Sequence, residues 1–172
     1  LPAICFVFSR FRVEKYAKMI NVNLFDYDDA HLPSTLRRDC ENIIRKLPNA
    51  HEYLKLPEFN ELVSLLEKGI AIHHAGIMPI LREMVELLFG KGYIKVLFAT
   101  ETFAVGLNMP TKTVIFTSMN KFTSDGPRDL YAHEYTQMAG RAGRRGIDTH
   151  GHVIHCPCIY RNMPSLIEYK QI

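Results

Sequence analysis

The sequence of 172 residues lacks several features that define other classes of protein. No apolar run approaches the about 18 residues needed to span a bilayer. The first residues, Leu1-Pro2-Ala3, show no basic-then-apolar export signal. Apolar residues make up 47% and charged residues 23%, a balance that excludes wholesale disorder. Lys and Arg number 21 against 18 acidic residues, so bulk charge alone does not indicate nucleic-acid binding. We expect one globular domain, residues 1–172, excised from a longer gene product.

Cysteines are few, and their spacing is irregular: Cys5, Cys40, Cys156 and Cys158. This pattern argues against a disulfide scaffold and predicts an intracellular, reducing compartment, nuclear or cytoplasmic. Histidines surround the last two cysteines, which suggests zinc. However, strand alternation over 152–156 would turn His155 away from the other ligands. We therefore expect a small buried strand with a tight turn and no metal site.

Five short apolar runs, apolar on both faces, predict buried strands of a sheet covered on both sides. They lie at 4–8, 70–72, 96–99, 114–116 and 153–154. Helical patterns separate them, at 12–19, 35–47, 58–67 and 79–89. In the last of these, Pro79 suits the first turn and Gly90 suits a left-handed stop. Strands that alternate with helices predict an α/β fold with a mostly parallel central sheet, whose functional residues lie at the carboxyl ends of strands.

Two segments interrupt this rhythm. Residues 23–60 hold clustered aspartates and three prolines, and they predict a helical insertion on the surface. Residues 118–130, with Gly126-Pro127, predict a polar loop. Residues 163–172 are expected to begin a following region or a tail.

The strongest chemical signal is the segment 137–146, QMAGRAGRRG. Its arginines lie among glycines, with no acidic residue between Tyr135 and Ile147. Arg141 and Arg144 are three residues apart, so a helical segment would project both from one face. Two guanidinium groups on one face suit a polyphosphate, because each offers paired donors and a permanent charge. This hypothesis requires that both groups reach a groove and are not pinned by carboxylates.

Polar residues follow the predicted strands and suit a nucleic-acid backbone. Thr100 and Thr102 follow the strand at 96–99, where hydroxyls and free N–H groups could hold a phosphate. Gly76, after the strand at 70–72, would open the backbone to a phosphate before the helix at Pro79. Ser9 could be a helix N-cap, a phosphate ligand or both. We expect His73 to pack in the core and His74 to act through its backbone.

Four segments together resemble superfamily-two helicases. Residues 137–146 resemble the arginine motif of the superkiller-type DExH-box RNA helicases, which include exosome cofactors. Residues 99–110 (ATETFAVGLNMP) are similar to motif V of that group. His73-His74-Ala75-Gly76 before Pro79 resembles motif IVa, and Phe6-Val7-Phe8-Ser9 is similar to motif IV. The motifs fall in the family's order. The resemblance implies a RecA-like three-layer sandwich and the second RecA-like domain only.

The resemblance also implies roles for individual residues. Arg141 and Arg144 would reach the γ-phosphate of ATP in a cleft between two RecA-like domains, and Gln137 would orient water or sense that phosphate. Gly106 and Asn108 would border the ribose. A single strand of RNA would be tracked by its phosphates, through Ser9, His74, Gly76, Thr100 and Glu101. Partners would be the first RecA-like domain and an RNA-degradation or RNA-processing complex.

Two elements of a complete motor are missing from the sequence. No Gly-x-x-x-x-Gly-Lys-Ser/Thr loop is present. Asp28-Asp29-Ala30-His31 resembles an Asp-Glu-x-His box only superficially, because no buried strand is predicted before it. ATP and Mg²⁺ would therefore be held mainly by the first domain, and we expect the isolated chain to be inactive. Three alternatives stay open: a DNA-repair helicase domain, a non-catalytic RecA-like binding module, and an unrelated α/β domain with a chance basic turn.

Overall fold

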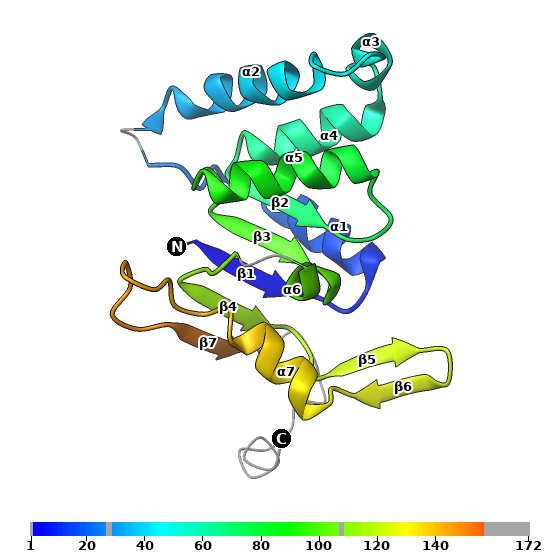
Figure 1. The fold of residues 1–172 in the computed structure, drawn as a ribbon, viewed down its shortest axis with the longest axis vertical. Helices are drawn as coiled ribbons and strands as arrows, with labels where there is room; N and C mark the ends of the chain where they lie inside the picture. The colour runs from blue at the N-terminus through cyan, green and yellow to red at the C-terminus, as the bar shows by residue number, and fades with distance from the viewer. Residues whose placement is uncertain (1, 27–28, 107–108, 157–172) are drawn as a thin grey trace.

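A computed structural model describes residues 2–26, 29–106 and 109–156 (Figure 1). Its centre is a parallel sheet of five strands in the order β2-β3-β1-β4-β7. The strands are β1 (Ala3–Phe6), β2 (Ile70–His73), β3 (Val96–Ala99), β4 (Thr113–Phe116) and β7 (His152–His155). The register pairs Ala99 with both Phe6 and His73, so three carboxyl ends lie level. The five runs predicted as strands are thus confirmed, and so is the parallel sheet. The expectation that the last strand is buried is wrong, because β7 lies at the edge of the sheet and Val153 and Ile154 are exposed.

Helices cover both faces of the sheet. They are α1 (Arg10–Met19), α2 (Leu32–Ile44), α3 (Ala50–Tyr53), α4 (Pro57–Leu66), α5 (Pro79–Gly90), α6 (Thr102–Gly106) and α7 (Ala132–Ala139). In Figure 1, α5, α6 and α7 lie in front of the sheet and α1 behind it. Right-handed crossovers explain this division, because chain segments that step in opposite directions along a sheet must cross on opposite faces.

The hydrophobic pattern explains the core. Strands β1 and β2 are buried at every residue, as expected for strands covered on both faces. In α5, Pro79 occupies the first turn. Of the apolar stripe that the sequence predicts to be buried, Ile80 is only partly buried and the others are buried: Leu81, Met84, Val85, Leu88 and Phe89. One detail differs. Gly90 ends the helix, and the left-handed residue is Gly92, with φ at 80°.

The two irregular segments have different outcomes. Helices α2 and α3 fall in 23–60, and α2 packs on α4 as an outer layer. That this pair is an insertion stays a prediction. The polar loop expected at 118–130 is wrong: this segment holds an antiparallel hairpin, β5 (Asn120–Thr123) and β6 (Gly126–Asp129). Gly126 has φ at 105°, which permits the tight turn.

Several predictions concern residues outside the described ranges: Asp28, Asn108, Cys158 and the segment 163–172. Within the described ranges, none of the helices combines the length and the apolar character needed to cross a bilayer. The same residues contain no group of three or more potential metal ligands. Burial raises the pKa of the Cys5 and Cys40 thiols to about 12, so both stay protonated at neutral pH.

Candidate nucleotide and nucleic-acid site

Five of the predicted site residues gather where β1, β2 and β3 end: Ser9, His74, Gly76, Thr100 and Glu101. We name this group the carboxyl edge. It forms because the three strands end level and each is followed by a turn into a helix. Ser9 is the N-cap of α1, and its Oγ accepts the Arg12 N–H at 3.4 Å. The N-cap expectation is confirmed, while phosphate contact by Ser9 stays a prediction.

His73 and His74 are both buried, and each is held by a carboxylate. His73 Nε2 lies 2.7 Å from Glu86 Oε1, and its ring meets Phe103 edge-on, with centroids 4.9 Å apart. His73 is therefore a core residue, as expected. Burial lowers the pKa of both histidines, so the imidazoles are neutral at neutral pH although carboxylates lie beside them.

His74 organises the turn that follows β2. Its Nδ1 accepts the Gly76 N–H at 3.1 Å, and its Nε2 lies 3.1 Å from Glu14 Oε1. Because Nδ1 accepts, these hydrogen bonds assign the ring proton to Nε2. A Cβ at Gly76 would lie 3.0 Å from Nδ1. A side chain at this position would thus crowd the His74 ring, and the Gly76 N–H is already engaged. Because the His74 side chain is buried, His74 is expected to contact a ligand only through its main chain, as the sequence suggests.

Thr100 and Glu101 lie between β3 and α6. Thr100 is buried; its N–H donates to the His73 carbonyl at 3.1 Å, and its Oγ1 lies 3.0 Å from Thr102 Oγ1. Strand β3 ends directly before Thr100, as the sequence predicts. The alternative of an unrelated α/β domain that lacks a strand at this position therefore does not hold. Gly106 is the last residue of α6. A ribose contact by Gly106 stays a prediction.

Gln137 is exposed on α7, where it lines a surface cavity of about 230 Å³. Glu101 and Lys121 line the same cavity. The structure thus brings a residue predicted for ATP and one predicted for nucleic acid to a common space.

The arginines lie elsewhere, and the expectation that they share one helical face is wrong. Helix α7 ends at Ala139, so Arg141 and Arg144 do not project from one helical face. They belong to a segment that we name the arginine loop, residues 140–151. The Arg141 carbonyl accepts the Thr111 N–H at 2.8 Å, which holds the loop beside the amino end of β4. The main chain of the arginine loop therefore lies at the opposite end of the sheet from the carboxyl edge, although the Arg141 side chain reaches α6.

Glycines shape this loop for its own packing. Gly143 has φ at 91°, which disfavours any residue with a side chain. A Cβ at Gly151 would lie 2.5 Å from the Ala142 carbonyl carbon. Gly143 and Gly151 thus let two segments of the loop backbone approach each other closely.

Both guanidinium groups are engaged. Arg141 donates to the Ala104 carbonyl in α6. Arg144 Nε and Nη2 donate to Asp148 at 2.8 and 3.0 Å, and its main-chain N–H donates to the same carboxylate at 3.0 Å. The hydrogen bonds to Arg144 hold the pKa of Asp148 well below its usual range. The requirement that neither guanidinium be held by a carboxylate is therefore not met by Arg144, whereas Arg141 is held by a main-chain carbonyl.

Asp148 was missed because it lies one residue beyond the acid-free segment that drew attention. Its position four residues after Arg144 was the available signal. The Asp148 side chain is 7% exposed and that of Arg144 is 29% exposed. The pair uses Nε and Nη2; Nη1 of Arg144 has no protein acceptor among the described residues. One edge of the guanidinium is thus fixed, and the other remains for a ligand.

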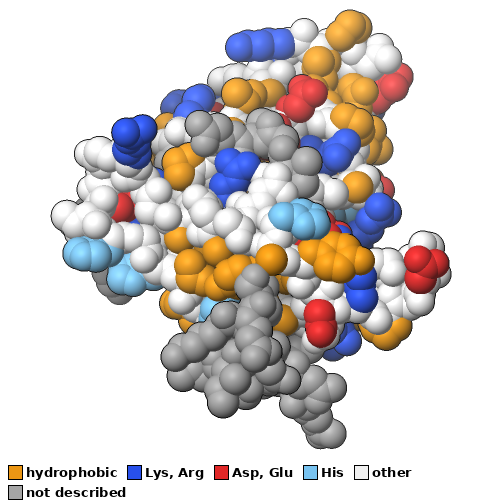
Figure 2. Space-filling model, turned by 60° about the horizontal axis from the view of Figure 1, so that its bottom comes forward, with side chains coloured by type: hydrophobic (Ala, Val, Ile, Leu, Met, Phe, Trp, Pro, Cys, Tyr) orange, Lys and Arg blue, Asp and Glu red, His pale blue; other side chains and the backbone are white. Residues whose placement is uncertain are grey.

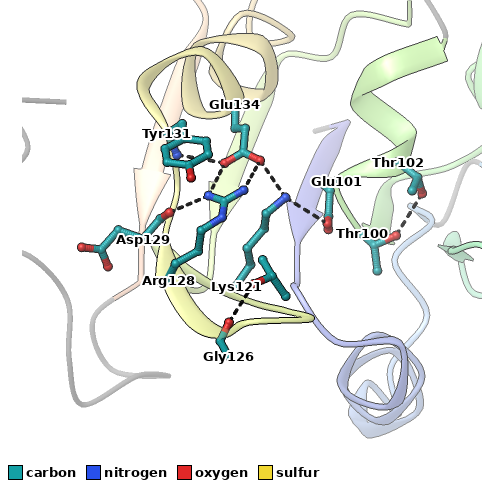
Figure 3. A network of polar contacts seen from close by, with 10 residues as sticks. Thr100, Glu101, Thr102, Lys121, Gly126, Arg128, Asp129, Tyr131 and Glu134 are labelled. Atoms are coloured by element: carbon teal, nitrogen blue, oxygen red, sulfur yellow. Dashed lines mark hydrogen bonds and ion pairs between the residues drawn. The ribbon is translucent and has the colours of Figure 1, made fainter.

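A further cluster, also missed, ties the hairpin to α7 (Figure 3). Arg128 Nη1 and Nη2 each donate to a Glu134 carboxylate oxygen at 2.8 Å. Lys121 Nζ lies 2.7 Å from Glu134 and 3.5 Å from Glu101. Hydrogen bonds from Arg128, and to a smaller extent from Lys121, hold the pKa of Glu134 well below its usual range. No sequence motif pointed to these residues, because the segment was expected to be a loop.

Charge does not gather into one basic patch on the face shown in Figure 2, where Lys and Arg side chains are scattered. This fits the formal charge of only +3. Recognition of an anion must therefore depend on local geometry rather than on the overall field.

Comparison with known proteins places these motifs in a family. The helicase conserved C-terminal domain matches residues 38–146. Over 173 aligned residues, 46% are identical to the antiviral helicase SKI2 of Saccharomyces cerevisiae, which covers 100% of this chain and 13% of that protein. Superkiller complex protein 2 of Homo sapiens is 44% identical over 90% of this chain and 12% of that protein.

The ATP-dependent RNA helicase mtr4 of Schizosaccharomyces pombe is 44% identical over 89% of this chain and 13% of that protein. The chain thus spans only a small part of these relatives. The matched range includes β2 to β4, α7 and both motif arginines, within a parallel α/β sheet of the RecA-like type. The chain belongs to the helicase conserved C-terminal domain family, with relatives of the superkiller type.

Proposed function

We propose that the chain is the second motor domain of an ATP-dependent RNA helicase. The observation that carries this proposal is the placement of two separate sets of residues on one rigid sheet. The carboxyl edge offers backbone and hydroxyl groups beside helix starts, which suit phosphates of a single strand. The arginine loop offers guanidinium groups, which suit a triphosphate. The family membership and the names of the relatives support the same assignment.

In this proposal ATP lies between the chain and a first RecA-like domain. Arg141 and Arg144 approach the γ-phosphate and stabilise the charge of the transition state, while Gln137 contacts water or the γ-phosphate. Asp148 keeps the Arg144 side chain oriented, so that Nη1 faces the ligand. In this proposal Mg²⁺ is held mainly by the first domain, because the sequence of this chain has neither a phosphate loop nor an Asp-Glu-x-His box after a buried strand.

Ser9, Gly76 and Thr100 lie along the phosphates of single-stranded RNA, with Glu101 beside that path, and His74 acts through the main chain. Contacts to phosphates give binding that weakens strongly with salt and has little base preference. Association with an RNA-degradation or RNA-processing complex, which the resemblance to superkiller-type helicases implies, is part of the proposal.

The proposal is tested by ATP hydrolysis of the longer protein that carries this chain, without nucleic acid and with single-stranded RNA or DNA. We expect stimulation by RNA and duplex RNA unwinding. Preferential stimulation by DNA would favour a DNA-repair helicase, and binding of RNA without hydrolysis would favour a non-catalytic module. For the chain alone we expect no turnover. Turnover by the chain that is lost in Arg144→Ala would contradict the dependence on a first domain.

A further inference from the structure

We infer that Lys121 is a positioning residue that links RNA binding to ATP hydrolysis. This inference rests on the proposed function. Lys121 belongs to neither predicted site, yet it contacts an acidic residue from each side. One is Glu101, at the carboxyl edge, and the other is Glu134, in the first turn of the helix that carries Gln137 (Figure 3).

The contacts of Lys121 are sheltered from solvent. Its side chain is 14% exposed, that of Glu134 is 17% exposed and that of Glu101 is 36% exposed. Charge pairs that are partly removed from water interact more strongly and are less screened by salt than pairs on open surface. Lys121 therefore constrains the relative positions of β5, α7 and the segment after β3.

Glu134 is the fixed partner in this cluster. It accepts two hydrogen bonds from Arg128 and one from the Tyr131 N–H at 2.8 Å, at the start of α7. Lys121 lies 2.7 Å from Glu134 but 3.5 Å from Glu101. The longer contact is the weaker one, so a change at the carboxyl edge is expected to alter the Glu101 contact first.

Helix α7 carries that change to the other end of the sheet. It has eight residues, Ala132–Ala139, and is therefore about 12 Å long. Its first turn holds Glu134, and its end leads directly into the arginine loop. Arg141 also donates to Ala104 in α6, the helix that follows Glu101. A phosphate that approaches Glu101 repels this carboxylate and attracts Lys121, and both effects shift the restraint on α7.

The test compares three variants of the full-length protein. Lys121→Met removes the charge that joins Glu101 to Glu134. Arg128→Gln loosens the hairpin from α7 but keeps the Lys121 contacts, and Lys121→Arg keeps the charge. The readouts are ATP hydrolysis with and without single-stranded RNA, RNA affinity by fluorescence anisotropy, and thermal unfolding.

For Lys121→Met we expect RNA stimulation to fall by about tenfold, within the usual range of coupling between sites. RNA-independent hydrolysis should be unchanged, and stimulation is compared at saturating RNA, so that a weaker RNA affinity does not account for its loss. Lys121→Arg should restore stimulation, and Arg128→Gln should keep most of it. Retained stimulation in Lys121→Met overturns the inference. An equal loss of stimulation in Arg128→Gln also overturns it, because attachment of the hairpin to α7 would then explain the effect without Lys121. Wild-type protein that RNA does not stimulate would instead contradict the proposed function.

Discussion

At the carboxyl edge, His73 and His74 are buried, neutral and hydrogen-bonded within the domain, whereas in the arginine loop Arg144 is charged and paired with Asp148. The first region owes its shape to burial and directional hydrogen bonds, which change little with salt. The second depends on an ion pair in which the arginine stays partly exposed. A main-chain surface that follows a polymer benefits from rigidity, while a guanidinium that meets a triphosphate must exchange contacts. We therefore expect the carboxyl edge and the arginine loop to respond differently to mutation, pH and ligand.

The largest expected effect concerns the arginine loop. In the full-length protein, Arg144→Ala should lower ATP hydrolysis by roughly 10³ to 10⁵, the range for arginines that stabilise phosphoryl transfer. The measurement is steady-state hydrolysis at saturating RNA. Arg145→Ala is the matched control, because Arg145 is an exposed neighbour. Equal loss in both variants would show that general positive charge matters, not the position of Arg144.

The carboxyl edge should respond most to loss of packing. Phe103 is 1% exposed and its ring contacts His73 and Phe89. Phe103→Ala should lower the free energy of unfolding by about 3–5 kcal/mol, because it removes a buried ring and leaves a cavity. Urea unfolding of the chain measures this. Phe122→Ala, at a ring that is 80% exposed, is the control and should change the free energy of unfolding by less than about 0.5 kcal/mol.

Asp148 tests whether the ion pair orients the arginine or withholds it. Asp148→Asn keeps the shape and one acceptor but removes the charge. We expect ATP hydrolysis by the full-length protein to fall by up to about 10², the effect of a small misplacement of a catalytic group. Faster hydrolysis in this variant would show that Asp148 restrains Arg144 from the ligand, and the orienting role would then be wrong.

The smallest effect is a dependence of stability on pH at the buried histidines. Their pKa values are lowered by burial, so the unfolded chain binds protons that the folded chain excludes. Stability is therefore complete above the ordinary histidine pKa of about 6.5 and falls as pH drops below it. Each histidine adds a slope of at most about 1.4 kcal/mol per pH unit.

Urea unfolding at pH 7.5 and 5.5 measures this slope for the chain and for His74→Asn. The variant should show a shallower slope than the wild-type chain. His51→Asn is the control, since the His51 side chain is 71% exposed. An unchanged slope in His74→Asn would remove His74 as a source of acid sensitivity.

Much of the fold could be predicted because its signals are local. The apolar runs of β1 to β4 and the stripe of α5 follow from burial and periodicity within a few residues. The hairpin β5–β6 could not be predicted in this way. Its strands are partly exposed and contain polar residues, and their stability comes from pairing with each other and from contacts to α7.

The same distinction between local sequence signals and contacts made by the fold applies to the candidate site. The spacing of Arg141 and Arg144 identified the motif, but a helical face was the wrong geometry, because α7 ends before them. Lys121 was missed because its importance comes from side chains that the fold brings to it, whereas Asp148 lies only four residues after Arg144 and could have been found from that spacing.

The order of residues by itself determined which segments become strands and helices and which stretches carry glycines and arginines, because these depend on side-chain chemistry at short range. Only the tertiary structure decided that the carboxyl edge and the arginine loop lie at opposite ends of the sheet. It also decided that His74 turns inward and that Lys121 lies between Glu101 and Glu134. Distances between residues far apart in the chain are set by how the parallel strands stack, and no local pattern contains them.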